Sequence, residues 1–330
     1  MKNKKTLSQI LSKYGVLMVF VVMFVFFSFA SPNFFKASNF MKVSRQINTL
    51  GICAVGMTIL LIAGGIDLSL GYQLSLVNVV CAWLMTNNVN WVLAVLLTLL
   101  MCAGIGAING LIIVKSGVHP MIITLAVSQV LQGASFLISK GVPIFGFPTE
   151  FSAMGQKSLF GVLPISLIIM VVIFIIGYII LAKVPYGRYL YAIGSNEEAA
   201  KLAGVNTAMV RFTAHTLCGL LTGIAGILLL SRTNSGMSNN GAGFEFNVIT
   251  ACVLGGVSNL GGRGNIYQAL LGVLIMGFLE NGMVMLGINA HWQLVITGTL
   301  LGIAVSYDSY MVRSSERVKK LKSINPENVE

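Results

Sequence analysis

Long apolar segments alternate with short polar or glycine-rich breaks along almost the whole chain. A helix needs about 20 apolar residues to cross the hydrocarbon core of a bilayer. Segments near this length lie at 15–31, 47–65, 68–86, 91–114, 120–139, 161–182, 208–230, 247–258, 266–286 and 292–308. The pattern predicts an all-α polytopic membrane protein of about ten transmembrane helices. The segment 247–258 is short, and a re-entrant half-helix is its alternative.

Positive charges predict which side of the membrane each break faces. An even number of spans puts both termini on one side, and cytoplasmic segments are enriched in Lys and Arg. With the N-terminus inside, the outer side holds only Lys36, Lys42, Arg45, Lys140, Lys157 and Arg232 of the 21 Lys and Arg residues. We therefore predict an N-in, C-in protein with cytoplasmic tails at 1–14 and 309–330 around a transmembrane domain at 15–308. The first three of these outer charges predict an interfacial segment before the second span.

Composition excludes a soluble globular protein and argues against nucleic acid as a partner. Hydrophobic residues make up 56% of the chain and charged residues 9%, against about a quarter charged in soluble domains. The net charge of +11 gathers at the two ends and in one internal loop, as membrane topology requires. The five cysteines lie in apolar runs without a CxxC pair, so we expect neither disulfides nor a metal site. A cleaved signal peptide is the alternative for the first apolar run, but the spans that follow favour an uncleaved helix.

A glycine pair and a lone carboxylate interrupt the apolar pattern at 51–71, GICAVGMTILLIAGGIDLSLG. Gly64 and Gly65 offer a place where a helix can open. Asp67 and Ser69 follow before hydrophobic sequence resumes, and a carboxylate beside a membrane span is costly. Two explanations stay open. Asp67 caps the third span in a tight turn, or the turn is an inner gate on a substrate path.

The segment 183–207, KVPYGRYLYAIGSNEEAAKLAGVNT, is the longest polar interruption on the predicted inner side. Ser195 and Glu198 have the spacing of a capping box, and Gly204 suits a helix stop. Asn206 is placed to cap the next span. We predict a cytoplasmic helix of about two turns that docks into a groove on another protein. A plain connector without a partner is the alternative.

Two weaker patterns concern helix packing and symmetry. Glycines spaced four apart predict close helix contacts at Gly106/Gly110, Gly219/Gly223 and Gly298/Gly302. The segments 107–120 and 279–292 share an Asn-Gly dipeptide and a later His. An inverted repeat, common in transporters, would produce such a pair on opposite sides of the membrane. Chance is the other explanation.

Several motifs together resemble the permease subunits of bacterial ABC importers for monosaccharides, of the ribose-transport type. They are SPNFFKASNF (31–40), AVGMTILLIAGGIDLSLG (54–71), GRYLYAIGSNEEAAKLAGVN (187–206), CGLLTGIAGILLLSR (218–232), ACVLGGVSNLGGRGNIYQALLGVLIMGFLENGM (251–283) and AVSYD (304–308). The resemblance covers nearly the whole chain. The chain departs from the family pattern at Gln132, where arginine is common before the glycine, and at NAHW (289–292). These departures leave the substrate open.

The resemblance implies a multi-pass protein of the bacterial inner membrane, embedded in lipid and paired with a second permease copy. It also implies a cytoplasmic ABC ATPase and an extracytoplasmic sugar-binding protein as partners. The permease itself would have no catalytic residue, no metal and no cofactor, because ATP is bound by the partner subunit. The EAA-xxx-G coupling pattern matches Glu198, Ala199, Ala200 and Gly204. The implied ATPase-coupling residues are Arg188, Gly194, Ser195, Glu197, Glu198, Ala199, Ala200 and Gly204.

Polar residues of the spans supply candidates for a gate or translocation path, because sugar hydroxyls need amide donors and acceptors. The candidates are Gly64, Gly65, Asp67, Ser69, Asn109, Gln129 and Asn281. The amides could equally bridge helices. Glu280 is either a functional acid inside the membrane or a solvated residue near the outer end of its span. His215 is interpreted as a packing residue.

We therefore expect the permease subunit of an ATP-driven importer that moves a monosaccharide, ribose or a similar sugar, by alternating access. The chain has no Gly-Lys dipeptide and hence no GxxxxGK[ST] nucleotide loop, so ATP hydrolysis is expected on a partner. The alternative is a stand-alone secondary sugar transporter coupled to protons through Glu280 or Asp67.

Overall fold

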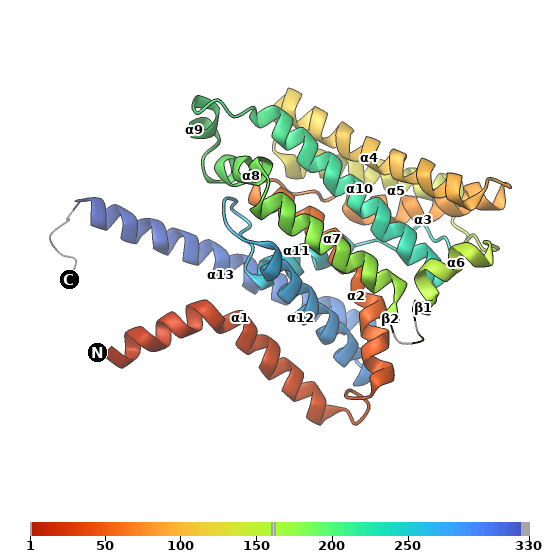
Figure 1. Ribbon diagram of the computed structural model, residues 1–330, viewed down its shortest axis with the longest axis horizontal. Helices are drawn as coiled ribbons and strands as arrows, with labels where there is room; N and C mark the ends of the chain where they lie inside the picture. The colour runs from red at the N-terminus through yellow and green to blue at the C-terminus, as the bar shows by residue number, and fades with distance from the viewer. Residues whose placement is uncertain (1, 160, 162, 325–330) are drawn as a thin grey trace.

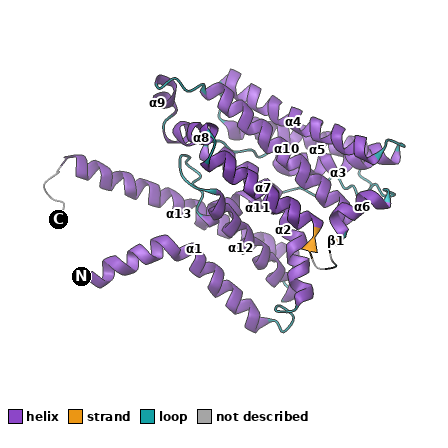
Figure 2. Ribbon diagram, in the orientation of Figure 1, coloured by secondary structure: helices purple, strands orange, loops and turns teal. Residues whose placement is uncertain are grey.

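Helices make up most of the computed structural model, which describes residues 2–159, 161 and 163–324 (Figures 1 and 2). Side chains are described except those of residues 2–14, 313 and 315–324. The helices of this part of the chain are α1 Lys2–Ala30, α2 Ala37–Ile62, α3 Leu70–Thr86, α4 Trp91–Ser116, α5 Pro120–Ser139, α6 Thr149–Gln156, α7 Ile165–Ala182, α8 Pro185–Ser195, α9 Glu197–Leu202, α10 Thr207–Thr233, α11 Phe244–Gly255, α12 Ile266–Met285 and α13 Ala290–Ile324. One antiparallel hairpin, β1 Ser158–Leu159 with β2 Leu163–Pro164, precedes α7. The predicted tails at 1–14 and 309–330 lie partly outside the described residues.

Each of the predicted spans overlaps a helix. Among the described residues, seven helices are long and apolar enough to cross a membrane, namely α2, α4, α5, α7, α10, α12 and the Ala290–Val312 part of α13. Shorter apolar helices are Gly15–Ala30, α3 and α11. The chain is therefore an all-α polytopic membrane protein. The count of ten spans and the N-in, C-in orientation stay predictions.

Several boundaries differ from the predicted ones. α2 begins at Ala37 and is continuous, so Lys42 and Arg45 lie on this helix and not on a separate interfacial segment. The span predicted at 161–182 begins at Ile165, because the hairpin occupies the residues before it. The Arg45 guanidinium donates to the Ser158 hydroxyl at 2.9 Å, which ties the hairpin to α2. Short helices α6 and α8 have no counterpart among the predicted elements.

Glycines allow α4 and α10 to pack closely against each other. A Cβ added at Gly106 or Gly110 of α4 would collide with the α10 backbone, and one added at Gly219 would collide with α4. This is the close contact that the glycine spacing predicts. No described atom lies within 4 Å of a Cβ built at Gly298 or Gly302, so this third pair makes no such contact.

The two ends of the bundle carry different elements (Figure 1). The start of α1, the end of α13 and the α8–α9 segment lie toward the left end of the view, and α6 and the hairpin lie toward the right end. The segment predicted to dock on a cytoplasmic partner therefore lies at the same end as the start of α1 and the end of α13, as the predicted topology requires.

Candidate functional site

The α2–α3 turn is closed by a glycine in left-handed backbone. Gly64 follows α2 with a φ of +75°. Its N–H donates to the Leu61 carbonyl at 2.9 Å, and the Gly65 N–H donates to the Leu60 carbonyl at 2.8 Å. This pair of bonds is the Schellman pattern, in which glycine avoids the strain that a side chain would cause. The glycine pair therefore ends α2 and turns the chain.

Asp67 is fully buried at this turn. Its Oδ1 accepts the Ser69 backbone N–H at 2.8 Å and the Ser69 hydroxyl. Asn109 of α4 donates to Asp67 Oδ2 at 3.4 Å and to Ser69 Oγ at 2.9 Å. The Leu68 N–H donates to Thr124 of α5 at 3.0 Å. Three predicted path residues thus form one polar cluster, which fastens the start of α3 to α4 and α5.

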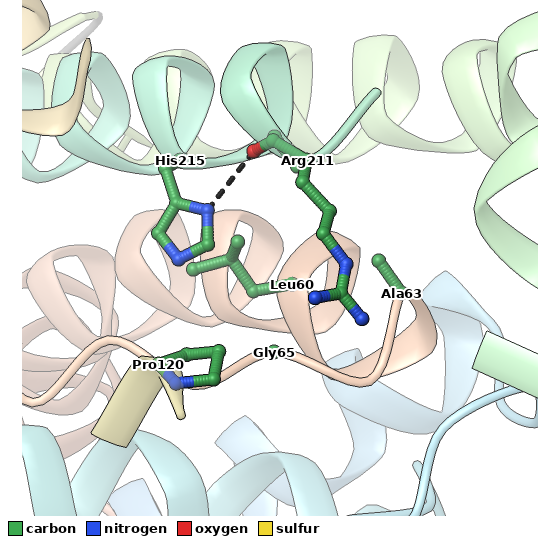
Figure 3. A pocket seen from close by; sticks show the side chains of 7 residues that line it. Leu60, Ala63, Gly65, Pro120, Arg211 and His215 are labelled. Atoms are coloured by element: carbon green, nitrogen blue, oxygen red, sulfur yellow. Dashed lines mark hydrogen bonds between the residues drawn. The ribbon is translucent and has the colours of Figure 1, made fainter. Parts of the chain in front are cut away.

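A small cavity of about 10 Å³ lies beside the turn (Figure 3). Gly65, Pro120, Arg211 and His215 are among the residues that line it. His215 Nδ1 lies 2.9 Å from the Arg211 carbonyl oxygen, whereas its buried Nε2 has no hydrogen-bond partner among the described residues. The volume is about that of one water probe. It is too small for a sugar, so the cavity is part of the helix junction and does not form a substrate site here.

The last turn of α8 lies between the two Gly-Gly loops of the chain. A Cβ at Gly194 would collide with the Ile62 carbonyl oxygen and with the backbone nitrogen of Gly262. The Gly262 N–H donates to that same Ile62 carbonyl at 2.9 Å. A Cβ at Gly261 would meet the Gly64 Cα at 3.1 Å. Three segments far apart in sequence therefore meet backbone to backbone, at what we call the glycine junction.

The loop that carries Gly261 and Gly262 is held from two sides. Asp308 of α13 accepts the Ser258 hydroxyl at 3.0 Å and the Asn259 N–H at 2.8 Å. The Tyr191 hydroxyl of α8 donates to the Gly264 carbonyl at 2.8 Å. Burial raises the pKa of the Tyr191 hydroxyl, which keeps it a donor. Displacement of α8 would therefore act on this loop through a direct hydrogen bond.

α9 begins one residue later than the sequence predicts. The Asn196 side chain accepts the Ala199 N–H at 2.9 Å, so the capping box predicted at Ser195 is wrong. Ser195 is the last residue of α8 and has helical backbone, whereas Asn196 has the extended backbone that an N-cap needs. The predicted cap of the next helix is confirmed, because Asn206 accepts the Met209 N–H at 3.0 Å.

The stop predicted at Gly204 is confirmed. Gly204 has a φ of +85°, and its N–H donates to the Lys201 carbonyl at 2.9 Å. The Val205 N–H donates to the Ala200 carbonyl at 3.0 Å, which completes a second Schellman pattern. The helix that results has six residues, Glu197–Leu202, and is shorter than the two turns predicted.

The predicted coupling residues divide into a group that contacts the rest of the bundle and a group that is exposed. Glu197 accepts Arg211 of α10 at 2.6 Å and lies 3.4 Å from Lys201, which attaches α9 to α10. Ala200 is buried, and Gly194 belongs to the glycine junction. The exposed members are Arg188, Ser195, Glu198, Ala199 and Gly204.

The remaining path candidates lie apart from the Asp67 cluster. Gln129 is exposed on α5. Asn281 of α12 is buried and exchanges two hydrogen bonds of 3.0 Å with Asn39 of α2. This amide pair bridges two helices, which is the other role that the sequence leaves open for such side chains.

A larger cavity of about 200 Å³ lies among α2, α10, α11 and α12. Glu280 lines it and accepts Gln46 at 3.3 Å on one carboxylate oxygen and Asn247 at 3.3 Å on the other. Arg232 and Asn240 also line it. Of these five residues, Glu280 is predicted as a candidate functional acid and Arg232 only as an outer charge, whereas Gln46, Asn240 and Asn247 are not predicted from the sequence. The only feature of the sequence that points to this cavity is the carboxylate of Glu280 inside an apolar span, because the hydrogen-bond partners of Glu280 come from distant segments.

A sequence model described as the permease component of the branched-chain amino acid transport system matches residues 39–305. The chain belongs to this permease family. The ribose import permease protein RbsC of Bacillus subtilis (strain 168) is 38% identical over 301 residues, which are 91% of this chain and 93% of the relative. The L-arabinose transport system permease protein AraH of Escherichia coli (strain K12) is 36% identical over 317 residues, 96% of each chain. No solved structure matches the chain significantly.

Membership of the permease family confirms the resemblance read from the motifs. Together with the candidate membrane spans it identifies a multi-pass protein of the bacterial inner membrane. The three segments that meet at the glycine junction lie within 54–71, 187–206 and 251–283, which are also three of the stretches that carry the resemblance.

Proposed function

We propose that the chain is the membrane-spanning subunit of an ATP-driven importer that carries a monosaccharide, ribose or a similar sugar, into the cytoplasm. The relatives named for ribose and L-arabinose transport support the sugar class. The observation that carries the mechanism is the α8–α9 segment. It is attached to the bundle on one face and exposes the other at the end where α1 starts and α13 ends.

The exposed face of α9 fits a protein partner. Leu202 is 90% exposed, beside the exposed Glu198 and Ala199. A large apolar side chain at the end of a short, well-capped helix is the kind of anchor that fills a groove on a partner. We assign that partner as a cytoplasmic ABC ATPase, because the chain has no nucleotide-binding loop.

A few direct contacts connect α9 to the α2–α3 turn, the proposed inner gate. Glu197 links α9 to α10, and α8 leads directly into the glycine junction. The junction touches Gly64, three residues before Asp67. Because packed backbone does not compress, a shift of α8 must move both Gly-Gly loops. Closure of the ATPase would open or close the α2–α3 turn by this route.

The complete importer would contain further subunits. We propose a second permease copy, with the path for the sugar along the bundle or the axis of the pair, and an extracytoplasmic sugar-binding protein that delivers the sugar. The permease would work without a catalytic residue, a metal or a cofactor of its own, with ATP held by the partner. The apolar faces of α4, α5 and α13 are suited to lipid.

Reconstitution with candidate partners tests the proposal. The permease, the ATPase and the binding protein encoded beside it are placed in liposomes, and uptake of labelled ribose and L-arabinose is measured with and without ATP. We expect uptake only with all components and ATP. Leu202→Asp should lower ATPase co-purification and uptake at least tenfold while the permease still reaches the membrane, because a charge replaces the apolar anchor.

Two results would contradict parts of this proposal. Sugar uptake by the permease alone under a proton gradient would overturn the ABC assignment in favour of a secondary transporter. Full coupling in the Leu202→Asp variant would instead overturn the assignment of α9 as the docking helix.

A further inference from the structure

The cavity among α2, α10, α11 and α12 has the size of a small polar ligand. Its volume of about 200 Å³ is far larger than the volume of about 10 Å³ of the cavity beside the α2–α3 turn. Pockets for drug-sized ligands hold about 300–1,000 Å³. The lining residue Gln46 lies about 24 Å along α2 from Ile62, which ends the helix at the glycine junction. The cavity is therefore distinct from the α2–α3 turn.

The polar wall of the cavity offers both donors and acceptors. Glu280 provides two carboxylate oxygens, and Gln46, Asn240 and Asn247 provide amides. The bonds from Gln46 and Asn247 to Glu280 are 3.3 Å long, beyond the usual range for N–H···O bonds. Hydrogen bonds from ligand hydroxyls can replace these two long bonds at a small cost in free energy. Thr49 also lines the cavity, and its hydroxyl forms no hydrogen bond with the described residues.

The charges of the cavity balance. Glu280 and Arg232 both line it, and the Arg232 guanidinium is held by the Arg45 carbonyl at 3.1 Å. One carboxylate and one guanidinium together favour a neutral ligand over an anion or a cation, because either ion would leave a like charge close by. Vicinal hydroxyls can donate to the carboxylate and accept from the guanidinium and the amides.

The rest of the lining is largely apolar. Ile47, Leu50, Leu229 and Phe244 contribute to it, interspersed with the polar residues on α2, α10 and α11. A sugar ring presents C–H groups on its faces and hydroxyls around its edge, and a cavity lined by both apolar and polar side chains can contact both. We propose that the cavity is an intramembrane binding site for a neutral monosaccharide, which the sugar occupies during transport. This inference rests on the proposed function.

Transport by cavity variants gives the first test. Asn247→Ala removes one amide, and Thr49→Val removes one hydroxyl at nearly constant volume, so that the fold is preserved. Each should lower the maximal rate of sugar uptake by the reconstituted complex about threefold to tenfold. The control, Asn87→Ala, removes an exposed amide from the α3–α4 loop and should leave the rate unchanged.

Protection of an engineered cysteine gives a second test that does not depend on transport. All five native cysteines are buried, so Gln46→Cys introduces a half-buried thiol in the cavity wall. The transported sugar should slow its labelling by a small thiosulfonate reagent at least threefold. The same sugar should not change labelling of Asn87→Cys.

The outcomes separate the two proposals. A wild-type complex that transports no sugar overturns the proposed function and this inference with it. A transporting complex in which the sugar leaves labelling of Gln46→Cys unchanged, and in which Thr49→Val and Asn247→Ala behave as wild type, overturns the cavity site alone.

Discussion

Single glycines set how closely the loops at the α8 end approach each other. At Gly194 a Cβ would collide with the Ile62 carbonyl oxygen, which already accepts the Gly262 N–H. At Gly65 a Cβ would find its nearest neighbours at 3.6 Å, an ordinary contact distance. An added methyl group would therefore destabilise the fold at Gly194 but not at Gly65, although both glycines belong to segments that the sequence singles out.

The pair gives a matched prediction. Gly194→Ala should lower the thermal unfolding midpoint of the purified permease and abolish ATP-driven uptake, because overpacking of this kind costs about 1–3 kcal/mol. Gly65→Ala should keep both within experimental error of wild type. Thermal unfolding in detergent and uptake in liposomes measure the two effects. A stable, active Gly194→Ala variant would contradict the glycine junction.

At the scale of elements, α9 is held by few contacts for a segment that is proposed to transmit force. Six residues cannot form a stable helix alone, so the caps at Asn196 and Gly204 and the bond from Glu197 to Arg211 define its position. Glu198 has the same side chain in the same turn but is exposed without an ion pair among the described residues.

These two glutamates provide an internal comparison. Glu197→Ala should speed amide hydrogen exchange in α9 by about twofold to fivefold, because a partly exposed ion pair contributes about 0.5–1 kcal/mol. Glu198→Ala should leave exchange in α9 unchanged while weakening co-purification of the ATPase. Mass spectrometry of the exchanged permease measures the first effect. Equal exchange in both variants would show that the ion pair does not position α9.

At the scale of the whole molecule, the glycine junction and the proposed sugar site lie at different positions along α2. α2 passes both, with Gln46 near the cavity and Ile62 at the junction. A path that opens first near the cavity and then near the junction would give alternating access, because the proposed ATPase would act at the α8–α9 end.

Labelling of single cysteines tests the orientation that this mechanism needs. Lys201→Cys on α9 and Asn87→Cys on the α3–α4 loop are both exposed positions, and the native cysteines are buried. An impermeant maleimide should label only Asn87→Cys in spheroplasts and only Lys201→Cys in inside-out vesicles. Labelling of both from one side would contradict the predicted topology.

The sequence by itself determined the class of fold and most of the helix positions. Span length and apolar composition are local properties set by bilayer thickness, so each predicted span overlaps a helix. Helix ends also follow local rules, as the stop at Gly204 and the cap at Asn206 show. The cap at Ser195 failed because two helices follow each other directly, which the local pattern does not reveal.

Only the tertiary structure decided which polar residues meet. Spans that are apolar on most sides carry little information about which face points inward. Asn109 therefore joins Asp67, while Asn281 joins Asn39 and Gln129 stays outside. The cavity around Glu280 and the glycine junction combine segments up to about 230 residues apart. Such contacts depend on the rotation of packed helices about their axes, and no local pattern specifies that rotation.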